Sequence, residues 1–288
     1  MQFVISLAFT PTVELCDIAR AADEAGFGAL AISDHVVHPE TIHTPYPYTP
    51  DGAPRWQPFT EWPDPWVAIA AMAAVTERIR FFTSIYVLPM RNPFLVAKQV
   101  ATAAVISDNR VGLGIGAGWM REEFACMEQP FERRGRRMDE MIDVMRKLWA
   151  GGWVEHHGEF YDFERLEMSP AVSDDPVPIY VGGVSEKALR RAATSADGWI
   201  SDLHSTAELR GLIESLRQRR ADSAKAGEPF AVIAAVGDAF DLDGYRRLRD
   251  IGVTHLQTVP WVFYGPGRGV QAKCDGIRRF AEDIIAAF

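Results

Sequence analysis

Asp34 and His35 are the neighbouring residues whose types and position best suit proton chemistry. They follow a short apolar run at residues 28–32, so they stand where a β-strand is expected to end. Imidazole titrates at about pH 6.5, which lets His35 donate or accept a proton near neutral pH. The alternative is a buried histidine held by Asp34 or by a backbone carbonyl. We predict that His35 is catalytic and that Asp34 lies beside it.

Other histidines are close to this pair in the sequence. His38 and His43 could join His35 in a metal site, but they lie in a proline-rich segment that defines no common face. No His-x-His follows the first predicted strand, as many metal-dependent barrel hydrolases need. The pair His156-His157 is expected to be solvated. We therefore predict no metal site.

A run at residues 111–118 alternates glycine with apolar residues. It lacks the third glycine of a dinucleotide-binding fingerprint, because Trp119 stands at that position. With the strand period of two, one face of this run carries only glycine and the other is apolar. The glycine face either leaves space for a flat ring inside a barrel or permits close strand packing.

A second glycine motif, Gly182-Gly183-Val184-Ser185, follows a predicted strand and precedes a predicted helix. Glycine lets backbone N–H groups point outward, and Ser185 can cap a helix whose dipole favours an anion. The motif therefore predicts a phosphate-binding turn, with a plain tight turn as the alternative. In barrels such sites more often follow strands seven and eight, whereas this motif follows strand five.

Short apolar runs alternate with longer amphipathic stretches along the chain. The strand-like runs lie at residues 3–8, 28–32, 80–87, 111–116, 177–181, 198–201, 231–236 and 253–258. The helical patterns lie at residues 13–25, 64–76, 93–107, 122–148, 186–194, 206–226, 242–250 and 270–287. Apolar strands that alternate with helices indicate a parallel sheet covered by helices. Eight such units predict an α/β fold, a single (β/α)8 TIM barrel over residues 1–288 rather than an open doubly wound sheet.

Three connections are longer than usual, at residues 36–63, 151–176 and 260–269. The first and third follow strand ends, at the face where barrel enzymes place their chemistry. The 36–63 segment is rich in proline and aromatic residues, Trp56 and Trp62 among them. We predict a substrate lid there, with a packed structural excursion as the alternative. The 151–176 segment is predicted to be a second insertion.

The composition excludes several classes of protein. With 48% hydrophobic and 24% charged residues, the 288-residue chain is neither disordered nor collagen-like. A net charge of −9 without a long basic tract argues against a nucleic-acid partner. The longest apolar stretch is too short to span a membrane, and the N-terminus shows no signal-peptide pattern. Three widely spaced cysteines argue against a disulfide framework, so we expect a cytoplasmic location.

Several motifs together resemble the luciferase-like monooxygenase superfamily, in particular its branch that uses the deazaflavin coenzyme F-420. The matching pieces are Ser33-Asp34-His35, Leu88-Pro89-Met90-Arg91-Asn92-Pro93, Ala97-Lys98-Gln99, residues 110–119, Arg121-Glu122-Glu123-Phe124, Arg137-Met138-Asp139-Glu140, Gly158-Glu159-Phe160-Tyr161, Pro178-Ile179-Tyr180-Val181-Gly182-Gly183 and Ala196-Asp197-Gly198-Trp199. Each is weak alone, but they occur in family order and their combination is specific. The chain beyond residue 205 supports only the fold.

This resemblance implies a homodimeric barrel with a cofactor cleft at the carboxyl ends of its strands. The cofactor ring would lie against Ser84 and Ile85, where relatives carry a non-prolyl cis bulge. Asp34 and His35 match positions that contact the ring or the substrate. The remaining cofactor contacts that the resemblance implies are Gly116, Ala117 and Gly118 for the ring and ribityl chain, and Gly182, Gly183 and Val184 for the phosphate.

Two departures from the family pattern stand out. Trp119 replaces a glutamate acid of the glucose-6-phosphate dehydrogenase relatives, which argues against that substrate. The turn at residues 107–110 has Asn109 where glycine is commoner, a small change because Asn tolerates the left-handed conformation.

We therefore expect an oxidoreductase that moves a hydride between F-420 and a small organic substrate. His35 would be the proton donor or acceptor, and Trp56, Trp62 and Tyr86 would contact a mostly apolar substrate. The alternatives are an FMN-dependent monooxygenase and a non-enzymatic deazaflavin-binding protein. A metal-dependent hydrolase is a third rival.

Overall fold

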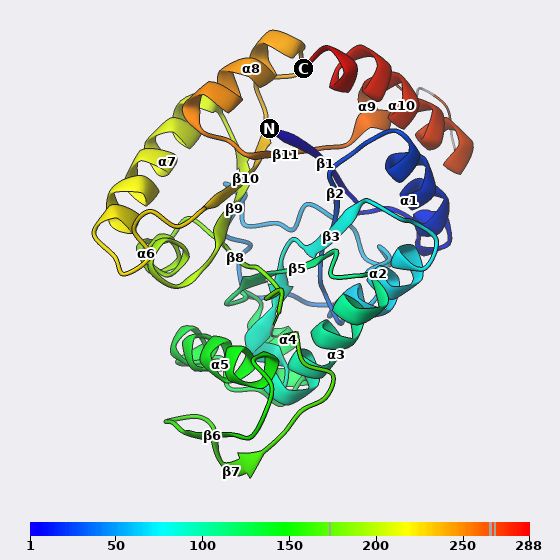
Figure 1. The fold of residues 1–288 in the computed structure, drawn as a ribbon. Helices are drawn as coiled ribbons and strands as arrows, with labels where there is room; N and C mark the ends of the chain where they lie inside the picture. Colours follow the sequence, from blue (N-terminus) through cyan, green and yellow to red (C-terminus); the bar gives the residue numbers. More distant parts are fainter. Residues whose placement is uncertain (173, 265–266, 268) are drawn as a thin grey trace.

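The chain forms a closed barrel of parallel strands surrounded by helices (Figure 1). The computed structural model describes residues 1–172, 174–264, 267 and 269–288. β3 (Arg80–Thr83) pairs with β5 (Val111–Gly116) and closes the sheet, and β4 (Tyr86–Val87) continues the interrupted strand of β3. The predicted TIM barrel is confirmed.

Around the barrel, the strands stand in the order in which they occur along the chain. A separate two-stranded hairpin is inserted in the chain between β5 and β8 (Ile179–Gly182). The barrel strands are β1 (Gln2–Ser6), β2 (Ala29–Ile32), β3 (Arg80–Thr83), β4 (Tyr86–Val87), β5 (Val111–Gly116), β8 (Ile179–Gly182), β9 (Gly198–His204), β10 (Ala231–Val236) and β11 (His255–Thr258). The hairpin, which is antiparallel, consists of β6 (Val154–His157) and β7 (Asp162–Leu166).

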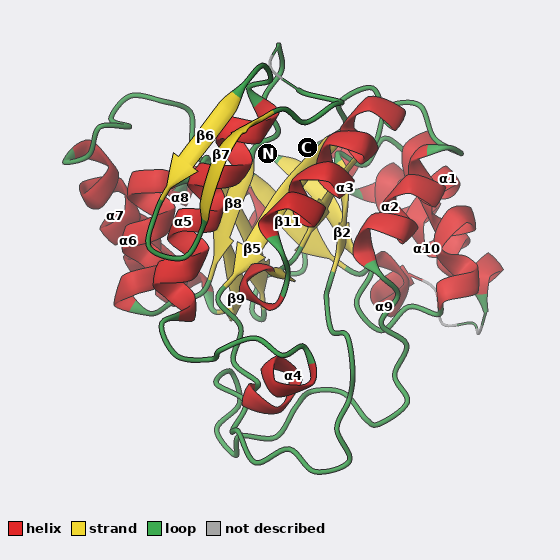
Figure 2. Cartoon of the chain, turned by 90° about the horizontal axis from the view of Figure 1, so that it is seen from below, coloured by secondary structure: helices red, strands yellow, loops and turns green. Residues whose placement is uncertain are grey.

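Helices cover the outside of the barrel, except α4 (Arg121–Cys126), which lies beyond the carboxyl ends of the strands (Figure 2). They are α1 (Leu15–Glu24), α2 (Pro65–Ala73), α3 (Pro93–Ile106), α4 (Arg121–Cys126), α5 (Arg134–Trp149), α6 (Glu186–Ser195), α7 (Thr206–Ala221), α8 (Leu242–Ile251), α9 (Pro260–Tyr264) and α10 (Val270–Asp283). Short 3-10 turns lie at Thr12–Glu14, Leu88–Met90 and Ile285–Ala287. In the described part of the chain, no helix is both long enough and apolar enough to cross a bilayer.

The apolar residues form two layers, as a barrel requires. One layer lies between strands and helices, where Leu113 and Ile115 of β5 are completely buried. The other fills the barrel interior with side chains such as Val4, Phe82 and Ile233. Each strand therefore contributes alternate side chains to both layers, which explains its nearly continuous apolar sequence.

Capping residues define where several helices begin. The Asp64 carboxylate accepts hydrogen bonds from the N–H groups of Trp66 and Val67, and Asn92 accepts one from Phe94. In both helices proline occupies the first position, where its missing N–H costs no hydrogen bond. These local signals explain why α2 and α3 begin close to the predicted residues.

The prediction of one helix over residues 122–148 is wrong. The chain forms α4 and α5 with a break between them. Pro130 lies in this break, and Arg133 has a φ of 59°, outside the helical region. Proline supplies no N–H and clashes with the preceding turn, so the amphipathic pattern on both sides cannot continue through it.

The break expected in the third strand is confirmed, since the peptide bond between Ser84 and Ile85 is cis. The turn before β5 also fits its sequence, because Asp108 and Asn109 both have a positive φ.

The two long insertions lie at opposite ends of the barrel (Figure 2). The 36–63 segment, hereafter the lid segment, extends with α4 beyond the carboxyl ends of the strands. The 151–176 segment contains the β6–β7 hairpin at the other end, where a connection from a helix to the next strand is expected. Ser173 in this insertion lies outside the described residues. The third predicted loop begins with α9, and its residues 265, 266 and 268 are also outside the described residues.

Candidate active site at the carboxyl ends of the strands

Asp34 is buried directly after β2, with 4% of its surface exposed. Its carboxylate forms a bidentate ion pair with Arg91, at 2.6 and 2.7 Å, and accepts the Val87 N–H at 2.8 Å. Burial raises the pKa of Asp34, while Arg91 and the Val87 N–H act in the opposite direction. Asp34 thus links the end of β2 to β4 and to the residues that follow it. Asp34 forms no hydrogen bond with His35.

His35 is held by the carboxylate of Glu123, a residue distant from it in the sequence. Its Nδ1 lies 3.1 Å from Oε2 of Glu123 in α4. The other oxygen of Glu123 accepts the N–H groups of Val36 and Val37 at 2.5 and 3.3 Å. Burial acts to raise the pKa of Glu123, but the contacts with His35 and these two N–H groups outweigh it, so the pKa lies below its ordinary value. Glu123 is therefore an ionised, buried hydrogen-bond acceptor.

Aromatic side chains surround His35. We call Tyr46, Trp56, Trp62 and Trp119 the aromatic cluster. The ring centroids of Trp56 and Trp62 lie 4.6 and 5.0 Å from that of His35. Tyr46 contacts both Trp56 and Trp119, at 5.4 and 5.1 Å. These edge-to-face and tilted contacts are favourable geometries for aromatic pairs.

The structure brings Trp56 and Trp62 to His35 but leaves Tyr86 apart from the aromatic cluster. Tyr86 is 1% exposed, lies beneath the guanidinium of Arg91 and contacts Trp66. The predicted contact of Tyr86 with a substrate therefore has no support from this geometry.

The lid segment also has polar contacts with α4 on one side and with β9 on the other. Glu122, which precedes Glu123 in α4, accepts the backbone N–H groups of His43 and Thr44 and the Thr44 hydroxyl. On the other side, Arg55 forms a bidentate ion pair with Asp202 of β9, with both distances 2.7 Å. The segment is thus held across the barrel mouth from α4 to β9.

Ile85 occupies the space next to the glycine face of β5. A Cβ added to Gly116 would lie 2.4 Å from Cδ1 of Ile85, and one added to Gly182 would lie 2.6 Å from its Cγ2. A Cβ added to Gly114 would lie 1.9 Å from the Thr83 carbonyl oxygen. The interpretation that this face leaves open space is wrong at these positions, because neighbouring strands and Ile85 fill it. Close packing accounts for the glycines here.

The residues around Ile85 complete this side of the mouth. Ser84 donates its hydroxyl to the Gln257 side chain of β11 at 3.3 Å. Gly118, with a φ of 77°, places its carbonyl oxygen 2.9 Å from Nε of Arg134. Ala117 is half-buried between Gly116 and Gly118.

The turn after β8 has the form of an anion site. Gly183 has a φ of 112°, which only glycine adopts readily, and Ser185 caps α6 by accepting the Ala188 N–H. Within the described residues, the N–H groups of Val184, Glu186 and Lys187 meet no acceptor. Arg219 pairs with the Glu186 carboxylate and so offsets its negative charge.

A chain of ring contacts joins this turn to His35. The Tyr48 hydroxyl would lie 3.8 Å from a Cβ added to Gly183. Tyr48 contacts Tyr46, and Tyr46 contacts Trp56, which packs on His35. The two ends of the candidate site are thus connected through the lid segment.

The histidines that prompted the metal alternative do not assemble. Within the described ranges there is no group of three or more potential metal ligands. His156 is not solvated as predicted, because it is 9% exposed and stacks on Phe163 near Glu140. His157 is exposed.

Comparison with known proteins places the chain in a family. The model of the family described as "Luciferase-like monooxygenase" matches residues 5–241. The chain belongs to this family. Its members are flavin- or F420-dependent oxidoreductases.

Three relatives show how the luciferase-like chain compares with known sequences and structures. It is 38% identical over 289 residues to "Uncharacterized protein Rv0940c" of Mycobacterium tuberculosis, covering 99% of both chains. It is 29% identical to an F420-dependent glucose-6-phosphate dehydrogenase of Nakamurella multipartita, over 82% of this chain and 66% of that protein. Its fold matches the coenzyme F420-dependent tetrahydromethanopterin reductase of Methanopyrus kandleri with a TM-score of 0.77 and 16% identity, over 100% and 99% of the two chains.

Glu123 and Asp202 are two of the site residues that sequence reasoning missed in this luciferase-like barrel. Glu123 was visible only as part of the motif at residues 121–124. A signal existed, because an acidic residue in a short helix directly after a buried strand lies at the carboxyl face of a barrel. Asp202 carried no comparable signal, since the predicted strand ended at residue 201.

Proposed function

We propose that this luciferase-like protein transfers a hydride between the deazaflavin coenzyme F-420 and a small organic substrate. The observation that carries the proposal is the placement of two groups at one end of the barrel. These are the glycine turn after β8, which leads into the capped start of α6, and His35 after β2, which faces the carboxylate of Glu123. The names of the Nakamurella and Methanopyrus relatives support F-420 as the cofactor.

The described residues fit such a cofactor. Within the described residues, the turn after β8 and the first residues of α6 offer a phosphate the N–H groups of Val184, Glu186 and Lys187, which have no acceptor. Ile85, which rests on Gly116 and Gly182, would support the ring system from the barrel side. When bound, the deazaflavin supplies the carbon that accepts or donates the hydride. The protein then positions the reacting groups and excludes water.

His35 exchanges a proton with the substrate in this proposal. Its Nδ1 is occupied by Glu123, so its Nε2 is the atom that faces the reaction. Trp56 and Trp62 would pack on the apolar part of the substrate. Within the described residues the indole N–H of Trp62 is buried without an acceptor, which makes it a second donor for a substrate oxygen.

An FMN-dependent monooxygenase is the second candidate, because the family is described by monooxygenase activity. Such an enzyme must also stabilise a peroxyflavin, and we identify no residue suited to that task. A deazaflavin carrier without activity is the alternative outside catalysis. Cofactor bleaching that depends on a substrate separates the carrier from the enzyme.

Paired equilibrium titrations with F-420 and FMN test the cofactor assignment. We expect tighter binding of F-420, and an affinity for FMN at least tenfold higher would overturn the assignment. Gly183→Ala forces a side chain into a conformation at φ 112° and should weaken cofactor binding about tenfold. Gly227→Ala is the matched control, because Gly227 has a φ of 82° and open surroundings and lies in the loop that precedes β10, at the amino ends of the strands. Equal effects of the two variants would contradict the phosphate role of the turn.

We further propose that two copies of the chain form a homodimer. Large apolar side chains on the outer faces of α2 and α3, including Val67 and Leu95, are 71% and 65% exposed. Light scattering of the purified protein tests this proposal, and a mass of one chain at micromolar concentration would contradict it.

A further inference from the structure

One carboxylate in this protein holds both a histidine and the first residues of a lid. Glu123 accepts the N–H groups of Val36 and Val37 through Oε1 and faces Nδ1 of His35 through Oε2. Its side chain is 2% exposed, so water does not compete for these contacts. We propose that Glu123 is a positioning residue that fixes the tautomer of His35 and couples it to the seating of the lid segment.

The tautomer follows from the chemistry of the carboxylate. An ionised carboxylate has no hydrogen to donate, so Nδ1 of His35 must carry the hydrogen that joins the two side chains. In neutral His35 the lone pair is then on Nε2. The ring is also confined from its sides by Trp56 and Trp62. Glu123 therefore decides which nitrogen can accept a proton, and the aromatic rings limit how the imidazole turns.

α4 provides a rigid support for this arrangement. Phe124, the residue after Glu123, is 1% exposed and packs with Val87 and Met90. Val87 donates its N–H to Asp34, which precedes His35 in the chain. The residues next to His35 and next to Glu123, Asp34 and Phe124, therefore both contact Val87 at the end of β4.

The coupling to the lid arises because the two oxygens belong to one group. Moving Val36 and Val37 away would remove two hydrogen bonds from a buried carboxylate, an unfavourable change unless the carboxylate moves with them. His35 would then lose its partner or its position. Neighbouring Glu122 differs, because it holds the lid segment at Thr44 and has no contact with His35.

Glu123→Gln and Glu122→Gln form a matched pair of variants. A glutamine at position 123 can accept one backbone N–H through its oxygen while its NH2 group donates to Nδ1 of His35. The hydrogen of neutral His35 should therefore move to Nε2. Nitrogen-15 NMR of the cofactor-free protein reports the tautomer, with the His35 signals assigned by their loss in His35→Gln. We expect Nδ1–H in the wild type and in Glu122→Gln, and Nε2–H in Glu123→Gln.

Trypsin reports the lid independently. Arg55 is the only lysine or arginine between residues 36 and 63, so cleavage inside the lid segment occurs after Arg55 alone. We expect cleavage there to be about tenfold faster in Glu123→Gln, and faster in Glu122→Gln as well. If Glu123→Gln does not fold, Glu123→Asp should keep the Nδ1–H tautomer and still increase cleavage. An Nε2–H tautomer in the wild type, or Glu123→Gln with unchanged tautomer or unchanged cleavage, would overturn the proposal.

The meaning of this coupling for catalysis rests on the proposed function, but neither measurement does. Tautomer and cleavage changes as expected, without binding of F-420, would contradict the proposed function and leave the role of Glu123 intact. Binding of F-420 by a protein whose His35 tautomer does not change in Glu123→Gln would contradict the role of Glu123 and leave the proposed function intact.

Discussion

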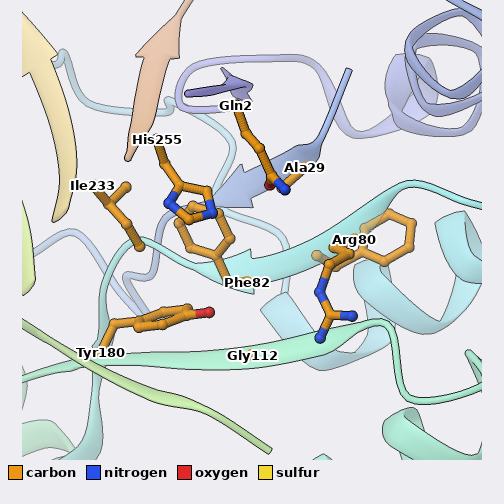
Figure 3. Close-up of a pocket in the computed structure, with 9 residues that line it drawn as sticks. Gln2, Ala29, Arg80, Phe82, Gly112, Tyr180, Ile233 and His255 are labelled. Atoms are coloured by element: carbon orange, nitrogen blue, oxygen red, sulfur yellow. The ribbon is translucent and has the colours of Figure 1, made fainter. Parts of the chain in front are cut away.

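The two ends of the barrel each contain a partly buried histidine, but their neighbours differ. At the carboxyl end, His35 faces the ionised carboxylate of Glu123 and aromatic rings. At the amino end, His255 lies beside a cavity of about 20 Å³, which has room for one water molecule (Figure 3). Gln2, Arg80 and Tyr180 also line this cavity. The cavity is far too small for a cofactor or substrate.

The electrostatic surroundings explain what each histidine can do. Burial lowers the pKa of His255 to about 4, and the N-terminal ammonium and Arg80 add to this effect. The Thr254 hydroxyl, 2.7 Å from Nδ1, is its hydrogen-bond partner. His255 is thus a neutral packing residue at neutral pH, whereas Nδ1 of His35 faces the carboxylate of Glu123. Burial alone does not indicate function, because the type of partner decides whether a histidine can take part in proton transfer.

The largest expected effect is on activity at the carboxyl end. His35→Ala should lower kcat by about 100-fold or more on any substrate found, the scale of general acid–base catalysis. The free energy of unfolding should change little, because the ring is at the mouth of the barrel. Steady-state kinetics and urea unfolding of both proteins check this. His255→Gln should leave kcat within about twofold, and equal losses in the two variants would remove the functional distinction between the ends.

The next effect concerns stability at the amino end. The unfolded chain binds a proton at His255 below about pH 6.5, whereas the folded protein binds one only near pH 4, so stability falls as the pH is lowered between these values. Between pH 7.5 and pH 5 this residue should remove about 2 kcal/mol from the free energy of unfolding. Between the same pH values, the free energy of unfolding of His255→Gln should fall by about 2 kcal/mol less than that of the wild type. Urea unfolding at both pH values measures it, and parallel losses in the two proteins would show that His255 does not titrate as described.

The smallest effect concerns the ion pair that holds the lid segment to β9. Asp202→Asn keeps the shape of the side chain but removes the charge opposite Arg55. Because the pair is partly exposed, the free energy of unfolding should change by less than about 1 kcal/mol. Trypsin cleavage after Arg55 should nevertheless become about threefold faster, since the lid is released locally. Asp243→Asn in α8, which breaks an exposed pair with Arg246, is the control. Cleavage that is the same in both variants would mean that Asp202 does not hold the lid.

The periodicity of the sequence was sufficient for most of the fold. β5 and β10 have the predicted bounds, and Arg110 before β5 and Gly237 after β10 each mark one end of an apolar pattern. The helix predicted over residues 122–148 failed at Pro130, where an amphipathic pattern continued across a break. The strand at residues 80–87 looked regular, and only the family resemblance indicated its interruption at Ser84 and Ile85. Periodicity reports which face is apolar, and it is insensitive to a local change of backbone direction.

By itself, the sequence determined the alternation of strands and helices, the family, and His35 as the residue suited to proton chemistry. The tertiary structure decided which groups hold that histidine and its lid. Glu123 is 88 positions from His35, and Asp202 is 147 positions from Arg55. Local propensities act over a few residues and cannot specify such pairs. They form because the closed barrel brings all strand ends to one face, and because a buried carboxylate must find hydrogen-bond donors there.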